Sequence, residues 1–326
     1  MRPNRSITAV AISLSTIALA TTVVSTTASA DPGFVPAANA IVGVGSDTTQ
    51  YVLNDLAKAY NSHSPQRKLA SFDATGSASI RIRPTVTVAR PDGSGAGIKA
   101  LSARTDIDFA RSSRAKKSTD PTNLAFLRYA KDQVRWMGNN HITRPRTLSK
   151  AQLNGIYNCR IRNWRQLGGP NLAIVPLVPQ AGSGTRSFWA DQVGFNGTTL
   201  PSCVKDKVGT KLVQEHDPAA VRSAGAGAIA PISYGRWVKL TAKQQSGVFV
   251  GALSSADVKK FNRDVFNVVK TDAAGVVPSY LADLFGNGRG TTSTGSGLPW
   301  ICKSEAQTII KRDGLSPLGA GVCGTK

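Results

Sequence analysis

The sequence predicts an α/β protein, and two patterns carry that prediction. Short apolar runs typical of buried strands alternate with segments of helical spacing along most of the 326 residues. In four places a turn rich in Ser, Thr and Gly follows such a run, and at least three of these turns lead into a predicted helix. This order is typical of mainly parallel sheets flanked by helices.

The N-terminal part repeats the order strand, turn, helix. The apolar run at 40–45 ends in glycine and predicts a buried strand, and 46–61 has the apolar spacing of a helix. Alternation at 84–90 predicts a second strand, with a helix in 91–104. A third strand is expected within 105–114, where an apolar core precedes a polar turn.

The remaining elements follow from the same two periods. Strands are predicted at 132–139, 172–179 and 224–235, and helices at 149–159, at 185–193 and at 303–314, the last ended by Gly314. The segment 255–270 is predicted to be an amphipathic helix, because its apolar residues share one helical face. These are Val258, Phe261, Val265, Phe266 and Val269. The Gly- and Thr-rich segment 286–297 predicts a surface loop.

The first 30 residues have the features of a signal peptide. Arg2 and Arg5 precede an apolar stretch, and Ala-Ser-Ala ends at Ala30. Cleavage there gives a mature chain that begins near Asp31, and no cysteine lies near the site to carry a lipid anchor. We therefore expect a secreted or extracytoplasmic protein.

The four cysteines predict two disulfides, since an exported chain meets an oxidising environment. Three pairings are possible, and we favour Cys159–Cys203 and Cys302–Cys323, which join neighbours along the chain. A zinc site is the alternative, but the sequence has no Cys-x-x-Cys spacing and only three histidines. We therefore predict neither a metal nor another cofactor.

The formal net charge of +21 favours anionic partners. Two classes fit: a binder of a small oxyanion, and an extracellular binder of polyanions such as wall polymers or nucleic acid. Basic residues are scattered, and only 6% of residues are aromatic. This weakens the case for a nucleic-acid surface, which interleaves basic and stacking side chains.

The four turns predict one anion pocket. They are "GSDTT" (45–49), "DGSGAG" (92–97), "ARSSR" (110–114) and "AGSGTR" (181–186). Turns at the carboxyl ends of parallel strands meet at one edge of a sheet, and each offers hydroxyls, amides and a helix N-terminus. Helix capping is the plain alternative for any single turn.

Enzyme motifs are missing from the last turn. Ser183 lacks the Gly-x-Ser-x-Gly elbow of a hydrolase, and no Lys-Ser/Thr pair of a P-loop follows the glycines. A triad of Ser183, His216 and Asp217 is the hydrolase alternative, but sequence adjacency gives it no geometry. We expect a binding protein rather than an enzyme.

The sequences of the four turns, and their order along the chain, resemble those of the phosphate-type substrate-binding proteins of ABC transporters. The similarity extends over about residues 40–240 and includes "LSKAQLNGIYNCRIRNWRQLGG" and "GAIAPISYGRWV". The resemblance implies the type II periplasmic-binding-protein fold, in which two mainly parallel α/β lobes are joined by two crossover strands. One lobe would hold 31–133 and 233–326, and the other 134–232.

The resemblance also implies a phosphate ligand, an ABC-transporter permease as partner, a monomer, and no specific nucleic acid. The predicted ligand-binding residues lie in the four turns. They are Ser46, Asp47, Thr48, Ser94, Gly95, Arg111, Ser113, Arg114, Gly182, Ser183, Gly184, Thr185 and Arg186.

Two departures from the family pattern leave the anion open. Pro179, Gln180 and Ala181 stand where the family has Arg-x-Asp or Arg-x-Glu, and Ser113 stands where it has a proton-accepting aspartate. Asp47 offers a replacement acceptor for a ligand proton. Phosphate is therefore the first choice, with sulfate or another tetrahedral oxyanion as the alternative.

Overall fold

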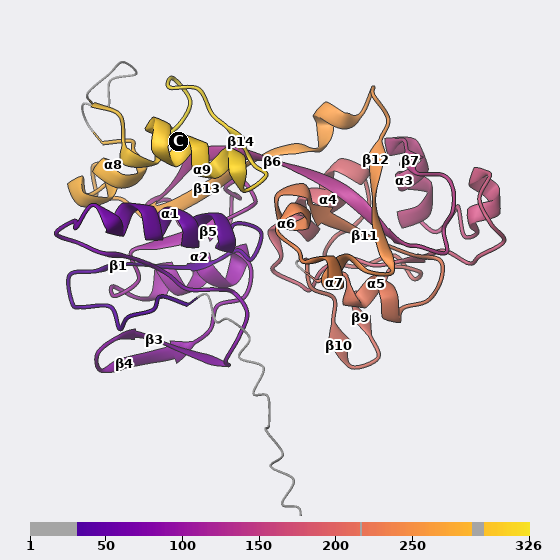
Figure 1. The fold of residues 1–326 in the computed structure, drawn as a ribbon, viewed down its shortest axis with the longest axis horizontal. Coiled ribbons are helices and arrows are strands. Elements are labelled where there is room, and N and C mark those ends of the chain that lie inside the picture. The colour runs from indigo at the N-terminus through magenta and orange to yellow at the C-terminus, as the bar shows by residue number, and fades with distance from the viewer. Residues whose placement is uncertain (1–30, 216, 289–296) are drawn as a thin grey trace, which may run out of the picture.

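A computed structural model describes residues 31–215, 217–288 and 297–326. The predicted signal peptide, His216 and most of the loop predicted at 286–297 lie outside the described residues. The molecule has two lobes joined by long strands (Figure 1). Each lobe is an α/β unit, as the sequence predicts.

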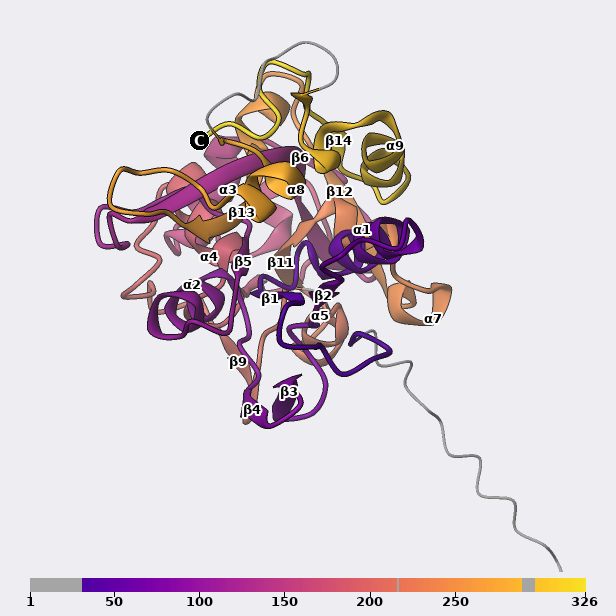
Figure 2. The same cartoon turned by 90° about the vertical axis from the view of Figure 1, so that its left-hand side faces the viewer.

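The first lobe is built on three parallel strands. They run in the order β2 (Leu69–Ser71), β1 (Ile41–Gly45) and β5 (Phe109–Ser112). Helices α1 (Gln50–Ser62) and α2 (Ser94–Ala103) pack on opposite faces of these strands (Figure 2). The alternation of strand side chains explains this: Ile41 lies in the core under α1, whereas Val42 lies in the core under α2.

Other elements of this lobe surround those layers. They are the hairpin β3 (Ser79–Arg83) and β4 (Val86–Ala89), with α8 (Ser279–Phe285), η4 (Trp300–Cys302), α9 (Ser304–Arg312) and β14 (Ser316–Pro317). The predicted strand at 84–90 is therefore found in the hairpin, at Val86–Ala89, rather than in the central sheet. The last predicted helix is confirmed as α9.

The second lobe has a parallel pair, β8 (Val175–Pro176) beside β11 (Ala228–Ser233). Its remaining strands are β7 (Thr147–Leu148), β9 (Lys207–Val208), β10 (Lys211–Leu212) and β12 (Val248–Leu253). Its helices are α3 (Lys150–Tyr157), η1 (Trp164–Leu167), α4 (Gly184–Val193), α5 (Ala219–Ser223), α6 (Tyr234–Val238), α7 (Ala242–Gln245) and η2 (Val258–Phe261). The strand predicted at 172–179 is reduced to two residues, because Pro176 and Pro179 limit its pairing.

Two crossover strands connect the lobes: β6 (Leu124–Asn139) and β13 (Asn262–Lys270). They pair with each other in antiparallel fashion, and the main path of the sheet runs β2-β1-β5-β13-β6-β11-β8, with β12 and β14 paired to β6 and β7 paired to β12. The sheet is therefore mixed, with parallel strands within the lobes and antiparallel ones at the crossing.

The prediction of a helix over 255–270 is wrong. Only Val258–Phe261 is helical, as a short 3-10 turn, and Asn262–Lys270 is a strand. Apolar residues at 265 and 269 pack in one apolar core and those at 266 and 268 in another, so β13, a central strand between β5 and β6, is buried on both faces. A strand buried on both faces has a continuous apolar run, which also satisfies a helical period over a short window.

The apolar cores place the return crossing later than the sequence analysis does. Leu240, Val248, Leu253 and Phe261 all pack in the cores of the second lobe. We therefore propose that this lobe spans about 134–261 and that the first holds 31–133 and 262–326. The apolar segment that ends at Ser233 is β11, and the chain after it continues in the second lobe instead of crossing back to the first.

The structure contains the disulfides Cys159–Cys203 in the second lobe and Cys302–Cys323 in the first. Both favoured pairings are present, and all four cysteines are used. Within the described ranges, no helix has the length and apolar character needed to cross a membrane.

Candidate functional site

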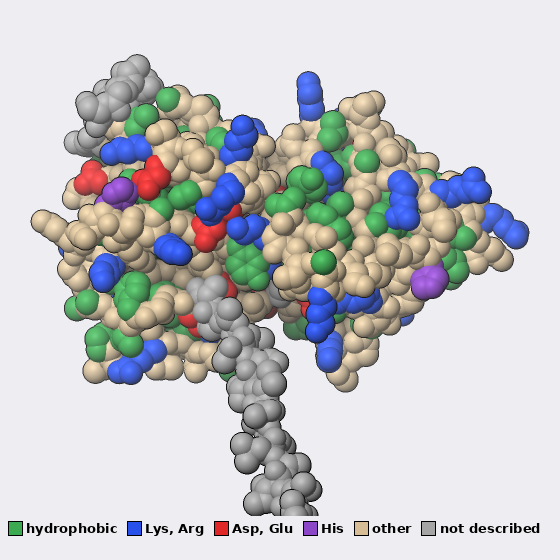
Figure 3. Space-filling view, viewed as in Figure 1, with side chains coloured by type: hydrophobic (Ala, Val, Ile, Leu, Met, Phe, Trp, Pro, Cys, Tyr) green, Lys and Arg blue, Asp and Glu red, His purple; other side chains and the backbone are tan. Residues whose placement is uncertain are grey.

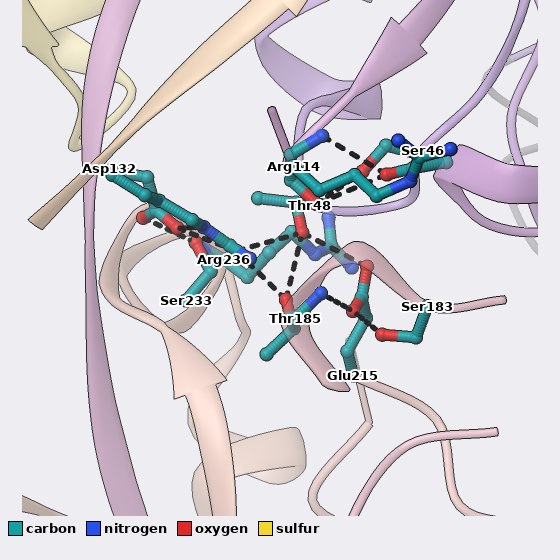
Figure 4. A network of polar contacts seen from close by, with 12 residues as sticks. Ser46, Thr48, Arg114, Asp132, Ser183, Thr185, Glu215, Ser233 and Arg236 are labelled. Atoms are coloured by element: carbon teal, nitrogen blue, oxygen red, sulfur yellow. Dashed lines mark hydrogen bonds and ion pairs between the residues drawn. The ribbon is translucent and has the colours of Figure 1, made fainter. Parts of the chain in front are cut away.

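The four predicted turns meet between the lobes (Figure 4). Three of them extend from the first lobe, after β1, before α2 and after β5, and the fourth begins α4 of the second lobe. Seven side chains at this junction are almost completely buried. They are Ser46, Asp47, Thr48, Ser94, Ser113, Ser183 and Thr185, each no more than 4% exposed. Such a density of buried polar groups requires internal partners.

The two lobes are in direct contact at this junction. The amide of Gly95 donates to the carbonyl oxygen of Gly182 across the interface at 3.1 Å. A Cβ atom at Gly184 would lie 2.4 Å from Ser113 Oγ and 2.5 Å from Ser94 Oγ. Glycine at 184 therefore permits the approach of α4 to the first lobe.

Hydroxyl groups link the three turns of the first lobe. Ser46 Oγ donates to Ser113 Oγ at 3.1 Å, and Ser94 Oγ lies 3.3 Å from the same atom. The amide of Ser113 donates to Ser94 Oγ at 3.0 Å. This chain of bonds fixes the three turns relative to one another.

A carboxyl group of the chain itself lies among the donors. Glu215, which is completely buried, accepts hydrogen bonds from Ser183 Oγ, from the amide of Thr185 at 3.1 Å and from Thr48 Oγ1 at 3.0 Å. Ser183 is also the N-cap of α4, since its Oγ accepts from the amide of Arg186 at 3.0 Å. The Gly-Ser-Gly-Thr turn therefore holds the carboxyl oxygens of Glu215 at a helix N-terminus, where an oxyanion is also expected to bind.

Asp47 and Glu215 form a coupled pair of buried acids. Burial, together with the charge of the nearby Asp47 and a hydrogen bond to it, raises the pKa of Glu215 to about 8. Burial also raises the pKa of Asp47, although a hydrogen bond with Glu215 opposes that rise. Two carboxyl groups this close favour a shared proton, with Glu215 as the donor and Asp47 as the acceptor.

An arginine from a crossover strand completes the cluster. Arg263 of β13 donates through Nη2 to Thr185 Oγ1 at 2.8 Å and to Thr48 Oγ1 at 3.3 Å. Its Nε and Nη2 also donate to Asp132 Oδ2 on β6, at 3.0 and 2.8 Å. The guanidinium is thus oriented by a buried ion pair while it contacts the hydroxyls of both lobes.

The three predicted arginines have other contacts. Arg111 donates to Ser71 Oγ and to backbone carbonyls of the first turn, and burial lowers its pKa to about 10. Arg114 pairs with Asp120, and Arg186 pairs with Asp206. The N–H groups of Arg114 and Arg186 donate to carboxylate and backbone oxygens of the protein. These bonds stabilise the loops, and none of them reaches Glu215.

Glu215, Asp132 and Arg263 were missed by the sequence analysis. Glu215 lies in "QEHDP", outside the four predicted turns, and Arg263 lies in the segment wrongly predicted as a helix. The signal that would find Arg263 is its place opposite Asp132 in the register of β6 and β13. The contacts do not support the hydrolase alternative. Ser183 donates a hydrogen bond to Glu215, and Asp217 accepts one from the amide of Ala219.

The chain matches a family model described as "PBP superfamily domain" over residues 21–283. No curated protein matches it. One similar solved structure is a putative phosphate ABC transporter substrate-binding protein from Clostridium perfringens with bound phosphate. It is 19% identical, with 86% of this chain and 100% of that one covered and a TM-score of 0.62.

Two further structures are similar. An ABC-type phosphate transport receptor from Vibrio cholerae is 20% identical, with 85% and 100% of the chains covered and a TM-score of 0.57. A phosphate-binding protein from Stenotrophomonas maltophilia is 16% identical, with 86% and 91% covered and a TM-score of 0.53. These likenesses show the two-lobed fold.

Proposed function

Because the chain belongs to the PBP superfamily, a family of substrate-binding proteins rather than enzymes, we propose that it captures an inorganic oxyanion between its lobes. Phosphate is the first candidate. The described residues direct two hydroxyls and one amide to the carboxyl group of Glu215 at the lobe interface, and the guanidinium of Arg263 donates to the adjacent Thr185 hydroxyl. Hydrogen bonds to a charged group are worth about 1.5–3 kcal/mol each, so such a set supports tight binding of an anion.

The observation that carries the proposal is the place of Glu215. Its carboxyl oxygens take the donors that a tetrahedral oxyanion requires, which supports an anion preference of the turn. For an external anion to bind, the Glu215 side chain must leave these donors. Arg263 takes the role that the absent family arginine leaves open, since it reaches Thr48 and Thr185 from β13.

The acids of the site favour an anion that carries protons. Asp47 accepts a hydrogen bond from protonated Glu215 here and would accept one from hydrogen phosphate in its place. Sulfate has no proton to donate near neutral pH, so a buried carboxylate repels it. This supports phosphate or arsenate over sulfate.

The family is extracytoplasmic, and the similar proteins from Clostridium and Vibrio are named as components of ABC-type phosphate transport. By analogy we propose that the chain is exported through a signal peptide at 1–30. It then acts as a monomer that delivers its anion to the permease of an ABC transporter.

The test is calorimetric titration of the mature chain with phosphate, arsenate and sulfate. The double variant Ser183→Ala with Thr185→Val removes two hydroxyls from the site. We expect it to cost about 3–6 kcal/mol of phosphate affinity, if the two losses add. Parent-like phosphate affinity in this variant would contradict the proposal.

A matched control removes two hydroxyls of the same types elsewhere. Ser304→Ala with Thr308→Val changes exposed positions of α9, far along the chain from the turns. This control should bind phosphate like the parent. Equal losses in both double variants would show that the effect is not local to the α4 turn.

A further inference from the structure

Arg236 on α6 is a buried cation whose charge opposes the rise in the pKa of the nearby Asp47. Only 1% of the residue is exposed, and its Nε and Nη1 have no hydrogen-bond partner among the described residues. No ion pair within the described ranges includes it. The contact that remains is with the ring of Tyr51, 3.9 Å from the guanidinium carbon to the ring centroid.

This arrangement differs from the other buried arginines. Arg111 donates to three oxygens, and Arg263 pairs with Asp132. Burying a charge is unfavourable unless the charge is paired, and stacking on an aromatic ring offsets only part of that cost. The guanidinium of Arg236 therefore has unused capacity to bind an anion.

The residue lines a pocket between the lobes. The pocket measures about 630 Å³ and is lined by Tyr51 and Thr75 of the first lobe and by Arg222, Arg236 and Lys243 of the second. Its volume falls within the range of small-molecule sites, about 300–1,000 Å³, and far exceeds one inorganic anion. An occupant would contact both lobes.

The charges of the pocket favour an anion. Asp217 is the acidic residue of its lining, and it lies 3.9 Å from Arg222. Arg222 also donates to the carbonyl oxygens of Gln244 and Ser246. Lys243 is exposed, and Nε and Nη1 of Arg236 have no hydrogen-bond partner among the described residues, so both side chains can donate to an anion in the pocket.

We propose that this pocket is a second anion site, which binds the carboxylate or phosphate group of a small organic anion through Arg236. The planar guanidinium fork matches both groups, and Thr75 and Lys243 add donors at the rim. The lining of this pocket contains none of the residues that donate to Glu215, although the charge of Arg236 also acts on Asp47 beside that turn.

The test is titration of the mature chain with two probes, glycerol 3-phosphate for the phosphate group and citrate for the carboxylate group. At least one probe should bind, and which one binds identifies the preferred group. Arg236→Gln should weaken that binding by about tenfold or more, which is the loss of one charged hydrogen bond. Lys243→Gln should weaken it by about threefold, and its exposed position keeps the fold intact.

Two controls make the result specific. Arg135 also lies over a tyrosine, with its guanidinium carbon 3.9 Å from the Tyr234 ring centroid, but outside this pocket. Arg135→Gln should leave probe binding unchanged. The variant Ser183→Ala with Thr185→Val should do the same.

Three outcomes would overturn the proposal. The first is that neither probe binds. The second is that Arg135→Gln weakens binding as much as Arg236→Gln. The third is that the Ser183 and Thr185 variant abolishes binding, which would place the probe at the α4 turn. Thermal melts check that each variant folds. If Arg236→Gln does not fold, the effect of Lys243→Gln on probe binding tests the proposal. Failure of the oxyanion proposal is visible separately, as unchanged affinity for inorganic phosphate in the double variant.

Discussion

At the scale of single residues, the Gly-Ser-Gly-Thr turn binds a carboxyl group of its own chain. Glu215 takes bonds from Thr48, Ser183 and Thr185, which come from both lobes. An internal carboxyl group of this kind competes with any external anion for the same donors. Binding therefore includes the free energy of moving a buried, largely protonated acid.

The raised pKa of Glu215 predicts a pH-dependent stability in the absence of ligand. The folded state holds the proton up to about pH 8, whereas the unfolded state releases it near the ordinary value of 4.5. Between these values the folded state binds more protons, so stability falls as pH rises. One proton gives a slope of at most about 1.4 kcal/mol per pH unit.

Denaturant unfolding of the phosphate-free chain at intervals from pH 4.5 to pH 8 measures this slope. Glu215→Gln removes the titrating group, so the slope should become markedly shallower. Glu305→Gln is a control, because that carboxyl group is 44% exposed and pairs with His63 at the surface. The same slope in the parent and in Glu215→Gln would show that Glu215 is ionised at low pH in the folded protein.

At the scale of elements, the crossover strands both join the lobes and build the site. Arg263 and Asp132 are direct partners in the antiparallel register of β13 and β6. Their side chains are 3% and 0% exposed, and Asp132 Oδ1 also accepts from Ser233 Oγ of β11 at 2.7 Å. The pair thus fixes three strands at the point where Arg263 reaches the donors.

Breaking this pair should be costly. Arg263→Gln leaves Asp132 as an unpaired buried charge, and Asp132→Asn does the same to Arg263, so each should lower the free energy of unfolding by about 3–5 kcal/mol. The double variant should cost less than the sum of the two. Chemical denaturation of the four proteins of the cycle measures the coupling energy.

The next pair along the same strands is the control. Lys131 and Asp264 are also register partners, with 3.3 Å between Nζ and Oδ1, but Lys131 is 52% exposed. The cycle of Lys131→Gln and Asp264→Asn should give a coupling below about 1 kcal/mol. Equal couplings for the two pairs would contradict the structural role given to Arg263 and Asp132.

At the scale of the whole molecule, the formal net charge of +21 includes Arg2 and Arg5 of the predicted signal peptide, and the remaining excess of basic residues is spread over both lobes. Figure 3 shows separate basic side chains on the visible face rather than one continuous basic groove. Several arginines are also buried or paired with acids, which reduces the charge that a polymer could contact. This distribution favours a buried oxyanion site over the polyanion alternative.

Salt dependence separates the two classes. Binding of phosphate at the buried turn should change by less than about threefold between 50 and 500 mM salt, because enclosed charges are poorly screened. Binding of a polyanion such as heparin should fall steeply over the same range, since it releases counter-ions. Calorimetry at several salt concentrations checks the first, and heparin-column retention checks the second.

Steep loss of phosphate binding with salt would favour a surface site. Tight heparin binding that persists at 500 mM salt would favour the polyanion class. Chloride is a suitable salt for both measurements, because sulfate competes for oxyanion sites.

The sequence by itself determined the α/β class, the four turns and the favoured disulfide pairs. Each of these depends on neighbours along the chain: apolar periods identify strands and helices, and Ser183 lies where a helix must begin. The order of the turns was enough to predict that they share one edge, and the structure brings them together.

Tertiary structure alone decided what lies among those turns. Glu215, Asp132 and Arg263 are placed there by pairings between residues far apart in sequence, such as Arg263 with Thr48. The same holds for β13, which is a strand because it pairs with β5 and β6, although its apolar spacing also fits a helix. Local periods record which residues are buried, but the partner that each buried charge meets depends on the packing of the whole sheet.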